Sequence, residues 1–475
     1  MPEFESASAL NDLYPYADRY GTNAVFPPEG RSRDGILREL RETAAEEDTF
    51  WQTGKGSGTM YSGDTEHYAL LNEAFALFSH MNALQRDMCP SATRFEGEIV
   101  AMTLDLMHAG AARPAASPCG SITAGGTESI LSAILAYRDQ ARERGIAVPQ
   151  IIKPETAHPA FDKAAHLLGL EVIEAPVDSH STLVDLAFVA DHINRDTAVL
   201  IGSAGNYPYG TIDPIQQLSQ LALERGVGLH VDACLGGFIL PWGEELGYDI
   251  PPFDFRLPGV TSISLDTHKF GYGLKGTSVL LFRERELRRR LFFLRPHWSG
   301  GAYSSPGLAG SRSVGLLAAT WASLVSVGRE GFRRYAKQIF ETSFAMQEVV
   351  TCHSELRLMG KPTFCFSFTS DLHRGLDIYH LNDFLRTKGW RFNGQQHPNA
   401  IHMCVTRPQT RPGLVEMFGR DLADGVAYAK NPPQDASRSG AIYGGNPNDA
   451  PEAEERIREF MIRYLDASED VPFGS

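Results

Sequence analysis

Four segments of the chain place residues that could carry out chemistry where strands end or helices begin. They are 123–129 (TAGGTES), 158–163 (HPAFDK), 230–237 (HVDACLGG) and 266–276 (DTHKFGYGLKG). In an open α/β sheet such segments lie at the carboxyl ends of the strands, where ligands bind. We therefore expect the four segments to line one ligand crevice.

The first segment, TAGGTES, precedes a long helical pattern. Its two glycines let a ligand approach the backbone closely. The first N–H groups of the helix and the hydroxyl of Thr127 offer donors where the helix dipole favours an anion. These features fit a phosphate site. A plain Gly-Gly turn with a capping threonine has the same pattern, and both interpretations stay open for this segment alone.

Asp232 and Lys269 stand at the ends of two apolar runs. A carboxylate at the position of Asp232 must be solvated, ion-paired or held against a cationic ligand, or it caps a following helix. Lys269 lies beside His268 in SLDTHK, and a partly buried lysine there would have a lowered pKa suited to a Schiff base. Taken alone, a lysine in a loop is more often an ordinary surface residue.

Together, the four segments predict a site for pyridoxal phosphate. Along the chain come an anion-binding Gly-Gly-Thr, a histidine, a strand-end aspartate and a His-Lys pair. Pyridoxal phosphate needs a phosphate site, a stacking partner, a carboxylate for its ring nitrogen and a lysine for its aldehyde. No metal site competes, because the histidines of this region lack paired ligands at metal spacings.

Short β-rich runs alternate with amphipathic helical stretches from Ala115 to about Phe282. The runs are QIIK (150–153), LEVIEAP (170–176), TAVLIG (197–202), GLHVD (228–232), TSISLD (261–266) and TSVLLF (277–282). This alternation is typical of an α/β domain with a mainly parallel sheet. Asp213 and Pro214 predict the N-cap and the first residue of one helix.

The sequence predicts three regions. Residues 1–113 form a helical segment with an active-site loop, 114–330 a large cofactor-binding α/β domain, and 331–475 a small C-terminal α+β domain. In the last region TFCFSFTS (363–370) and IHMCV (401–405) predict strands, and 377–388, 412–430 and 451–466 predict helices. The Pro-, Gly-, Asn- and Ser-rich stretch 431–450 predicts a loop.

Composition excludes several classes of function. The 475 residues include 44 Lys and Arg against 58 Asp and Glu, a formal charge of −14 that repels nucleic acid and anionic membranes. The uncharged run 313–328 is shorter than the roughly 20 apolar residues of a membrane span, so we expect a buried helix and no transmembrane segment. Six scattered cysteines and the absence of signal-peptide features predict a cytoplasmic protein.

The chain resembles the sphingosine-1-phosphate lyase branch of the group II decarboxylase-like, fold-type I pyridoxal phosphate enzymes, from about Gly58 to Gly445. The resemblance is carried by TAGGTESILSAILAYRD, HPAFDKAAHLLGLEV, GTIDPIQQLSQLA, GLHVDACLGGF, VTSISLDTHKFGYGLKGTSVLLF, GGAYSSPGLAGSR and GAIYG. It implies a transferase-like α/β fold, with a mainly parallel sheet in the large domain and a smaller C-terminal α+β domain, in a soluble enzyme of bacterial type.

The resemblance also implies the cofactor contacts. Lys269 would form the Schiff base with pyridoxal 5'-phosphate, Asp232 would pair with the pyridinium nitrogen, and His158 would stack on the ring. The residues similar to phosphate ligands are Gly126, Thr127 and His268.

A homodimer with shared active sites is implied as well. The residues expected to act in the partner's site are Tyr61, Gly310 and Ser311. The residues expected to bind the substrate or assist proton transfer are Tyr61, Tyr207, Lys275 and Tyr303, with Lys275 and Tyr207 as candidate proton handlers. Gln85, in NALQRDMCP, departs from the family, in which many relatives carry a histidine in an NPLHPD-type stretch. We therefore expect the substrate headgroup to meet a neutral amide there.

The implied activity is that of an aldehyde-lyase of the sphinganine-1-phosphate aldolase type. It would cleave the C2–C3 bond of a phosphorylated sphingoid base into a long-chain aldehyde and phosphoethanolamine. An amino-acid decarboxylase is the alternative, and it would need a cation or donors for an α-carboxylate. A catalytically inactive, pyridoxal phosphate-binding regulatory protein would need a damaged site, whereas Lys269, Asp232 and His158 are all present.

Overall fold

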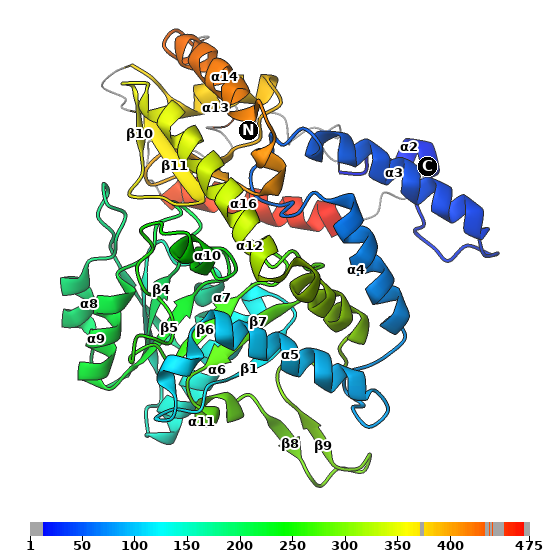
Figure 1. Ribbon diagram of the computed structural model, residues 1–475, viewed down its shortest axis with the longest axis vertical. Coiled ribbons are helices and arrows are strands. Elements are labelled where there is room, and N and C mark those ends of the chain that lie inside the picture. Colours follow the sequence, from blue (N-terminus) through cyan, green and yellow to red (C-terminus); the bar gives the residue numbers. More distant parts are fainter. Residues whose placement is uncertain (1–12, 371–374, 433–436, 438, 440–450, 470–475) are drawn as a thin grey trace.

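The fold is built on two β-sheets that one long helix connects (Figure 1). The computed structural model describes residues 13–370, 375–432, 437, 439 and 451–469. The larger sheet has seven strands in the order β1-β7-β6-β5-β4-β2-β3. Their bounds are β1 (Cys119–Thr123), β2 (Gln150–Pro154), β3 (Glu171–Ala175), β4 (Thr197–Ser203), β5 (Gly228–Asp232), β6 (Ser262–Leu265) and β7 (Ser278–Phe282).

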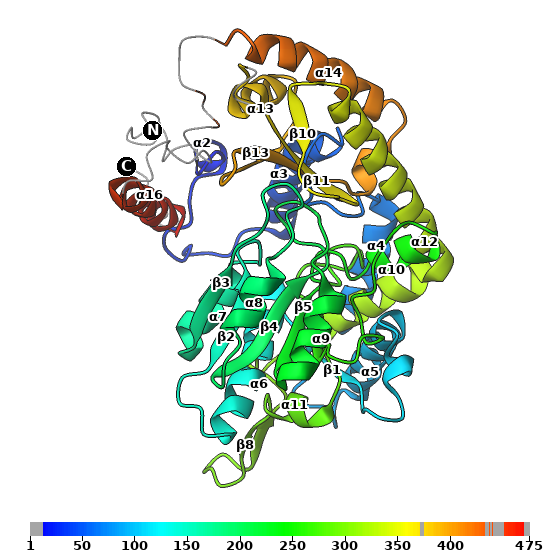
Figure 2. The ribbon, with the colours of Figure 1, turned by 90° about the vertical axis from the view of Figure 1, so that its left-hand side faces the viewer.

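The larger sheet is mainly parallel, as the sequence predicts. β7 runs antiparallel to β1 and β6, whereas β3, β2, β4, β5 and β6 pair in parallel. Val199 and Ile201 of β4 share one core with α6 (Gly126–Glu143) and α7 (Ala160–Leu168), whereas Leu200 shares another with α9 (Ile215–Arg225). Because alternate side chains of a strand point to opposite faces, both faces of the sheet are covered by helices (Figure 2).

The strands expected from the six apolar runs are all present, each within one residue at either end. Two features of this region are not predicted from the sequence: β1 and the hairpin of β8 (Phe293–Arg295) and β9 (Tyr303–Ser305). The sequence of β1, CGSIT, consists mostly of small residues with weak strand preference. The remaining helices of this region are α8 (Leu186–His192), α10 (Leu240–Glu245) and α11 (Arg285–Arg289).

The expected N-cap at Asp213 is wrong. Helix α9 begins at Ile215, and Pro214 occupies the N-cap position without a side-chain capping bond. The side chain of Asp213 turns toward β4, where Oδ2 accepts a hydrogen bond from the N–H of Ser203 at 2.7 Å. The carboxylate that the local pattern predicts as a helix cap is therefore hydrogen-bonded to the backbone at the end of β4 instead.

The smaller sheet is antiparallel and has the order β10-β11-β13-β12. Its elements are β10 (Leu356–Leu358), β11 (Cys365–Ser370), α13 (Ile378–Thr387), β12 (Asn393–Gln395), β13 (Ala400–Cys404), η3 (Arg407–Thr410) and α14 (Leu414–Ala429). Helix α12 (Val314–Thr351) leads to this sheet and kinks at Gly328, whose φ is 58°. The domain boundary after residue 330 stays a prediction. Most of the expected loop 431–450 and the motif GAIYG lie outside the described residues.

The N-terminal region is helical, with α2 (Ala17–Tyr20), α3 (Arg33–Trp51), α4 (Thr65–Phe78), α5 (Pro90–Leu106) and η1 (Ala109–Ala112). Helices α4 and α5 pack on α12, whereas α3 projects from the body of the molecule (Figure 1). The last described helix is α16 (Pro451–Glu469). The run 313–328 forms the buried first half of α12, as expected. Within the described residues, none of the helices combines the length and apolarity that a membrane span requires.

Gly210 joins the loop after β4 to the smaller sheet, and this contact predicts a stability difference between two glycine variants. Gly210 and Gly226 both have positive φ, of 69° and 66°. A Cβ at Gly210 would overlap the carbonyl oxygen of Cys365, whereas a Cβ at Gly226 would meet no atom within 4 Å. Gly226→Ala should lower the free energy of unfolding by about 1–2 kcal/mol, the ordinary cost of left-handed backbone. Gly210→Ala should cost about 1–3 kcal/mol more. Equal losses in urea denaturation would contradict this contact.

Candidate active site

A cavity of about 680 Å³ lies where the parallel strands of the larger sheet end. All four segments singled out in the sequence contribute side chains to it, so the expectation of one crevice is confirmed. Its volume is within the usual range for small-molecule sites. The lining residues are Tyr61, Ala124–Leu131 without Ser129, His158, Lys163, Ser203, Gly205–Tyr207, Asp232, Cys234, Leu235, Asp266, His268 and Lys269.

The N-terminus of α6 forms one wall of the cavity and lacks a side-chain cap. A Cβ at Gly126 would lie 2.8 Å from Oδ2 of Asp266 and 2.9 Å from Sγ of Cys234, so a side chain does not fit there. His268 stands beside Gly125 and donates from Nδ1 to the carbonyl of Thr277 at 2.8 Å. The free N–H groups and the helix dipole make this wall suited to an anion.

Lys269 is held by a buried carboxylate. Its Nζ lies 2.9 Å from Oδ2 of Asp266, a residue only 3% exposed, and Oδ1 of Asp266 has no hydrogen-bond partner within the described part of the chain. Burial lowers the pKa of Lys269, but the charge of Asp266 and its hydrogen bond, together with nearby Cys234 and Asp232, outweigh burial, so the pKa is raised. The expected lowering of this pKa is therefore wrong for the structure as it stands. Asp266 opens the fourth segment of the sequence, but its pairing with Lys269 is not predicted there, although a carboxylate three residues before a lysine is a usable signal.

Asp232 lies at the end of β5, and its Oδ1 accepts a hydrogen bond from the N–H of Cys234 at 3.0 Å. The next helix, α10, begins only at Leu240, so Asp232 is not a helix cap. Burial, together with the charge of Asp232, raises the pKa of nearby Asp213 to about 7. Asp213 thus keeps its proton below that pH.

His158 follows β2 and lines the same cavity. Its Nδ1 accepts a hydrogen bond from the N–H of Ala160 at 3.1 Å, which leaves the proton of the neutral ring on Nε2. Tyr207 lines the cavity too, and its hydroxyl accepts a hydrogen bond from Nδ2 of Asn393 at 2.9 Å.

Tyr61 lies in the cavity of its own chain, which differs from the expectation that it acts in a partner's site. The loop that leads to Tyr61 is fixed beside the smaller sheet of the same chain by two backbone hydrogen bonds. The N–H of Ser57 donates to the carbonyl of Arg391 at 3.0 Å, and that of Gly58 to the carbonyl of Cys404 at 3.1 Å. Lys275 places Nζ 4.9 Å from the centre of the Tyr61 ring.

Lys275 does not itself line the cavity, but it contacts two residues that do, Tyr61 and His268. Its Nζ donates to the carbonyls of Thr59 and His268, each at 3.4 Å. Desolvation by these neighbours and the positive charge of Lys269 lower the pKa of Lys275. A lysine with a lowered pKa can accept a proton near neutral pH more readily than a solvated one.

Four other expected site residues lie outside this cavity and are named the second cluster: Gln85, Tyr303, Gly310 and Ser311. Ser311 accepts a hydrogen bond at Oγ from Nδ2 of Asn82 at 2.9 Å. A Cβ at Gly310 would lie 3.3 Å from the Tyr303 hydroxyl. Gln85 is an exposed residue in the turn before α5. A cavity of about 370 Å³ lies at this cluster, between the turn and the β8–β9 hairpin.

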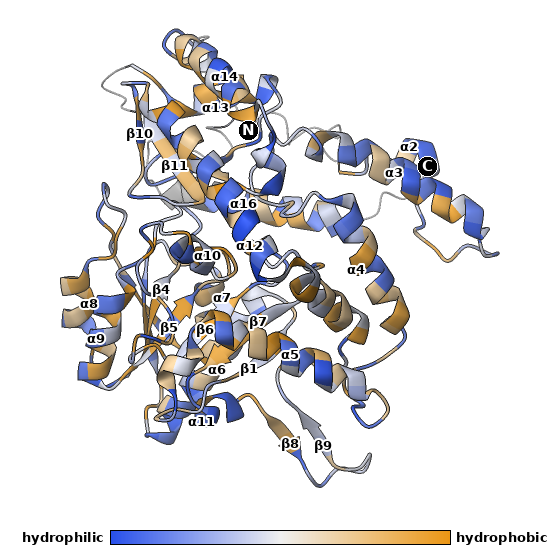
Figure 3. Cartoon of the chain, in the orientation of Figure 1, coloured by the Kyte–Doolittle hydropathy of each residue, from blue (hydrophilic) through white to orange (hydrophobic). Residues whose placement is uncertain are grey.

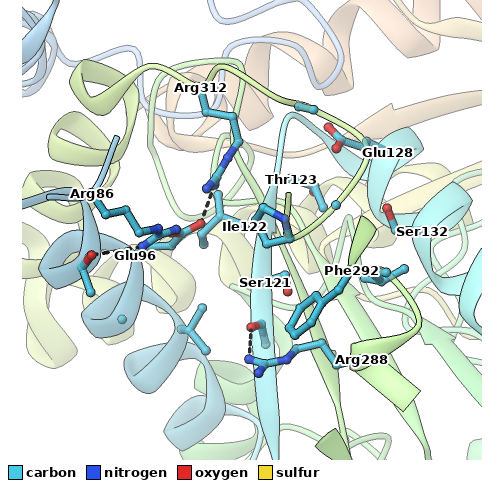
Figure 4. A pocket seen from close by; sticks show the side chains of 18 residues that line it. Arg86, Glu96, Ser121, Ile122, Thr123, Glu128, Ser132, Arg288, Phe292 and Arg312 are labelled. Carbon is cyan, nitrogen blue, oxygen red and sulfur yellow. Dashed lines mark hydrogen bonds and ion pairs between the residues drawn. The ribbon is translucent and has the colours of Figure 1, made fainter. Parts of the chain in front are cut away.

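A third cavity, of about 300 Å³, runs along the outer edge of β1 (Figure 4). Arg86 and Arg312 both pair with Glu96 on its wall, and Arg288 donates to the carbonyl of Gly120 at 3.2 Å. Glu128 lines both this cavity and the 680 Å³ cavity, so the two adjoin at the N-terminal turn of α6.

Comparisons with known proteins agree with this geometry. Residues 15–368 match the family described as the pyridoxal-dependent decarboxylase conserved domain. The chain is 43% identical over 423 residues to the sphingosine-1-phosphate lyase of Dictyostelium discoideum, covering 88% of this chain and 78% of that protein. It is 41% identical to sphingosine-1-phosphate lyase 1 of Rattus norvegicus, covering 88% and 73%.

Solved structures give the same result. The sphingosine-1-phosphate lyase of Burkholderia pseudomallei superposes with a TM-score of 0.90 and 56% identity, over 97% of this chain and 100% of that chain. A glutamate decarboxylase of Lactobacillus brevis has a TM-score of 0.75 at 20% identity, over 88% and 98%, and is similar in fold alone.

The raised pKa of Asp213 predicts a pH-dependent stability difference. A carboxyl group that stays protonated in the folded chain but ionises above about pH 4 in the unfolded chain makes the free energy of unfolding fall as pH rises. This fall continues until the folded chain also loses the proton, at about pH 7. Asn has the shape of the protonated acid and does not titrate. Asp213→Asn should therefore gain free energy of unfolding relative to the parent chain, by about 2 kcal/mol more at pH 8 than at pH 5.5. Urea denaturation of both chains at the two pH values measures this, and a difference independent of pH would show that Asp213 is ionised in the fold.

Proposed function

Since the chain belongs to the pyridoxal-dependent decarboxylase family and, within it, to the sphingosine-1-phosphate lyases, we propose that it cleaves the C2–C3 bond of phosphorylated sphingoid bases. The products are a long-chain aldehyde and phosphoethanolamine. One observation carries the proposal: identity with proteins named as lyases extends over most of the chain, whereas the solved glutamate decarboxylase is similar only in fold.

The cofactor is pyridoxal phosphate, and the residues of the 680 Å³ cavity fit it. Gly126 and Thr127, at the open N-terminus of α6, would hold the phosphate, with His268 beside them. Asp232 would hold the ring nitrogen, His158 the ring face and Lys269 the aldehyde carbon. Within the described residues Oδ1 of Asp266, which lines this pocket, has no hydrogen-bond partner, and this buried acceptor supports a bound ligand there. When bound, the cofactor supplies an electron sink for the bond that breaks.

Two proton transfers are needed, and different side chains in and beside the cavity would carry them out. Lys269 must lose a proton from Nζ before it can act as a nucleophile, and Oδ2 of Asp266, 2.9 Å away, is the acceptor in contact with it. Lys275, with its lowered pKa, is our candidate to take the proton of the C3 hydroxyl. Tyr207, whose hydroxyl is oriented by Asn393, is the second candidate. Tyr61, between Lys275 and the cavity, would bind the substrate.

We propose further that the active enzyme is a homodimer and that the second cluster completes the partner's site. Gln85, Tyr303, Gly310 and Ser311 lie outside the cavity of their own chain. The ribbon has hydrophobic colouring along parts of α4 and β8 (Figure 3), and large apolar side chains are exposed on these two elements and in the loops near the second cluster. These side chains are Leu70, Leu77, Leu84, Met88, Phe293, Leu294, Trp298 and Leu308. An exposed apolar surface of this kind supports burial against a second copy.

In this arrangement Gln85 would reach the substrate headgroup from the partner chain. Its amide offers neutral donors and an acceptor, and it brings no titrating charge to the phosphate. We also propose a cytoplasmic location, which the six free cysteines support because a reducing compartment keeps thiols unpaired.

Lys269→Ala tests the proposed reaction. The purified chain incubated with a phosphorylated sphingoid base should release aldehyde and phosphoethanolamine in equal amounts. Lys269→Ala should reduce this release to background and remove the visible absorbance of the bound cofactor, because no other amine is expected to bind the aldehyde carbon. Lys361→Ala is the matched control, since Lys361 is an exposed lysine paired with Asp249. Turnover by Lys269→Ala, or carbon dioxide release from amino acids without aldehyde from the lipid, would contradict the proposal.

Subunit mixing tests the shared sites. Chains carrying Lys269→Ala should be mixed with chains carrying Tyr303→Phe and Ser311→Ala together, each mutant set being inactive alone. If the second cluster serves the partner, random dimers should recover up to about a quarter of parental activity, because one of two sites is intact in half of the dimers.

The control for this mixing uses Tyr61, which lines the same cavity as Lys269. Lys269→Ala mixed with Tyr61→Phe should give no recovery, because no heterodimer then holds an intact cavity. If verified heterodimers of Lys269→Ala with the Tyr303→Phe and Ser311→Ala chain recover no activity, the second cluster does not belong to the partner's active site. If Lys269→Ala mixed with Tyr61→Phe recovers activity, Tyr61 acts in the partner's site.

A further inference from the structure

A buried chain of hydrogen bonds runs from Asp232 away from the cavity. Oγ of Ser264 lies 3.4 Å from Oδ1 of Asp232 and 3.2 Å from Nε2 of His230. Nδ1 of His230 lies 2.7 Å from Oγ of Ser262, which lies 2.7 Å from the hydroxyl of Tyr137. Ser262, Ser264 and His230 are 0% exposed and Tyr137 is 1% exposed, so water does not compete for these bonds.

Strand register brings these side chains together. His230 and Asp232 are two residues apart on β5, so their side chains leave the same face of the sheet. Their partners on β6 are Ser262 and Ser264, which pair with them in parallel register. Tyr137 comes from α6, which packs on this face. A sheet position that normally holds apolar residues thus holds a complete polar network.

Each hydrogen bond of the network has a defined donor, and the donation runs from Tyr137 toward Asp232. Burial lowers the pKa of His230 to about 4, so its ring is neutral and has a single N–H. A carboxylate at Asp232 can only accept, which sets Ser264 as its donor. Ser264 then accepts from Nε2 of His230, and Nδ1 accepts from Ser262. The hydroxyl of Tyr137 donates to Ser262 or to Thr261, whose Oγ1 is 2.6 Å away.

We propose that His230, acting through Ser264, is a positioning residue for Asp232. The inference rests on the proposed role of Asp232 as the carboxylate that holds the cofactor's ring nitrogen. Ser264 gives the carboxylate a fixed donor, and His230 fixes the hydroxyl of Ser264. Tyr137 joins this network to α6, whose first turn is the proposed phosphate site. The residues that would hold the two ends of the cofactor, Asp232 and the first turn of α6, therefore belong to one buried framework.

Ser264→Ala tests the proposal, with Ser262→Ala as its matched control. Each variant removes one buried hydroxyl that contacts His230, and only Ser264 reaches Asp232. The dissociation constant of pyridoxal phosphate is measured by reconstitution of the cofactor-free full chain, together with its unfolding temperature. Ser264→Ala should weaken cofactor binding about tenfold, as loss of a hydrogen bond to a charged group predicts, and more than Ser262→Ala does. Ser264→Thr should restore it.

A double variant separates positioning from general stability. If Ser264 acts through the charge of Asp232, Ser264→Ala should weaken cofactor binding much less in an Asp232→Asn background. Equal losses of unfolding temperature in the two serine variants, with unchanged cofactor affinity, would overturn the proposal. His230→Ala would leave a buried cavity and destabilise the fold by itself. The test therefore relies on the serine variants, which remove a single oxygen each. A parent chain that binds the cofactor but does not cleave phosphorylated sphingoid bases would contradict the proposed function and leave this inference standing.

Discussion

The ion pair between Asp266 and Lys269 is the interaction on which the active site depends. Asp266 is nearly inaccessible to solvent, and a buried carboxylate needs a cation or donors close by. Lys269 meets that need at 2.9 Å, and α6 packs against the same carboxylate so closely that position 126 has no room for a side chain. Removing one partner of a buried pair typically costs about 3–5 kcal/mol, so the lysine is also part of what holds this edge of the sheet together.

Three carboxylates lie near the edge of the larger sheet where its parallel strands end, and each has a different environment. Asp266 is paired with a lysine, and Asp232 lies against the cavity with backbone and hydroxyl donors. Asp213 is buried behind Asp232 with a raised pKa and so avoids a second negative charge there. Around one cavity the strongly acidic chain thus combines the N-terminus of α6, Lys269 and Lys275, which suit an anion, with the carboxylate of Asp232, which suits a cation.

Much of the fold follows from local patterns in the sequence. Most of the six apolar runs are strands whose residues, such as Val199, Leu200 and Ile201, are buried on both faces of a parallel sheet, and such strands have continuous apolar sequences. The edge strand β3 is the exception, because its residues are largely exposed and include Glu171 and Glu174. The segments after these strands line one cavity because parallel strands end at the same edge. β1 lacks that apolar signal, and its place at the sheet edge depends on pairing with β7.

The sequence by itself determined the fold class, the family and the set of polar residues at the strand ends, because each is written in residues close together along the chain. Only the tertiary structure decided which of these residues meet. It placed Tyr61 in the cavity of its own chain, on a loop that Ser57 and Gly58 fix by backbone hydrogen bonds. It also turned Asp213 toward Ser203 instead of its helix. It also raised the pKa of Lys269 where partial burial alone predicts a lowering. Charge, burial and backbone donors from other segments set these outcomes, since electrostatic and hydrogen-bond energies depend on distance in space and not along the sequence.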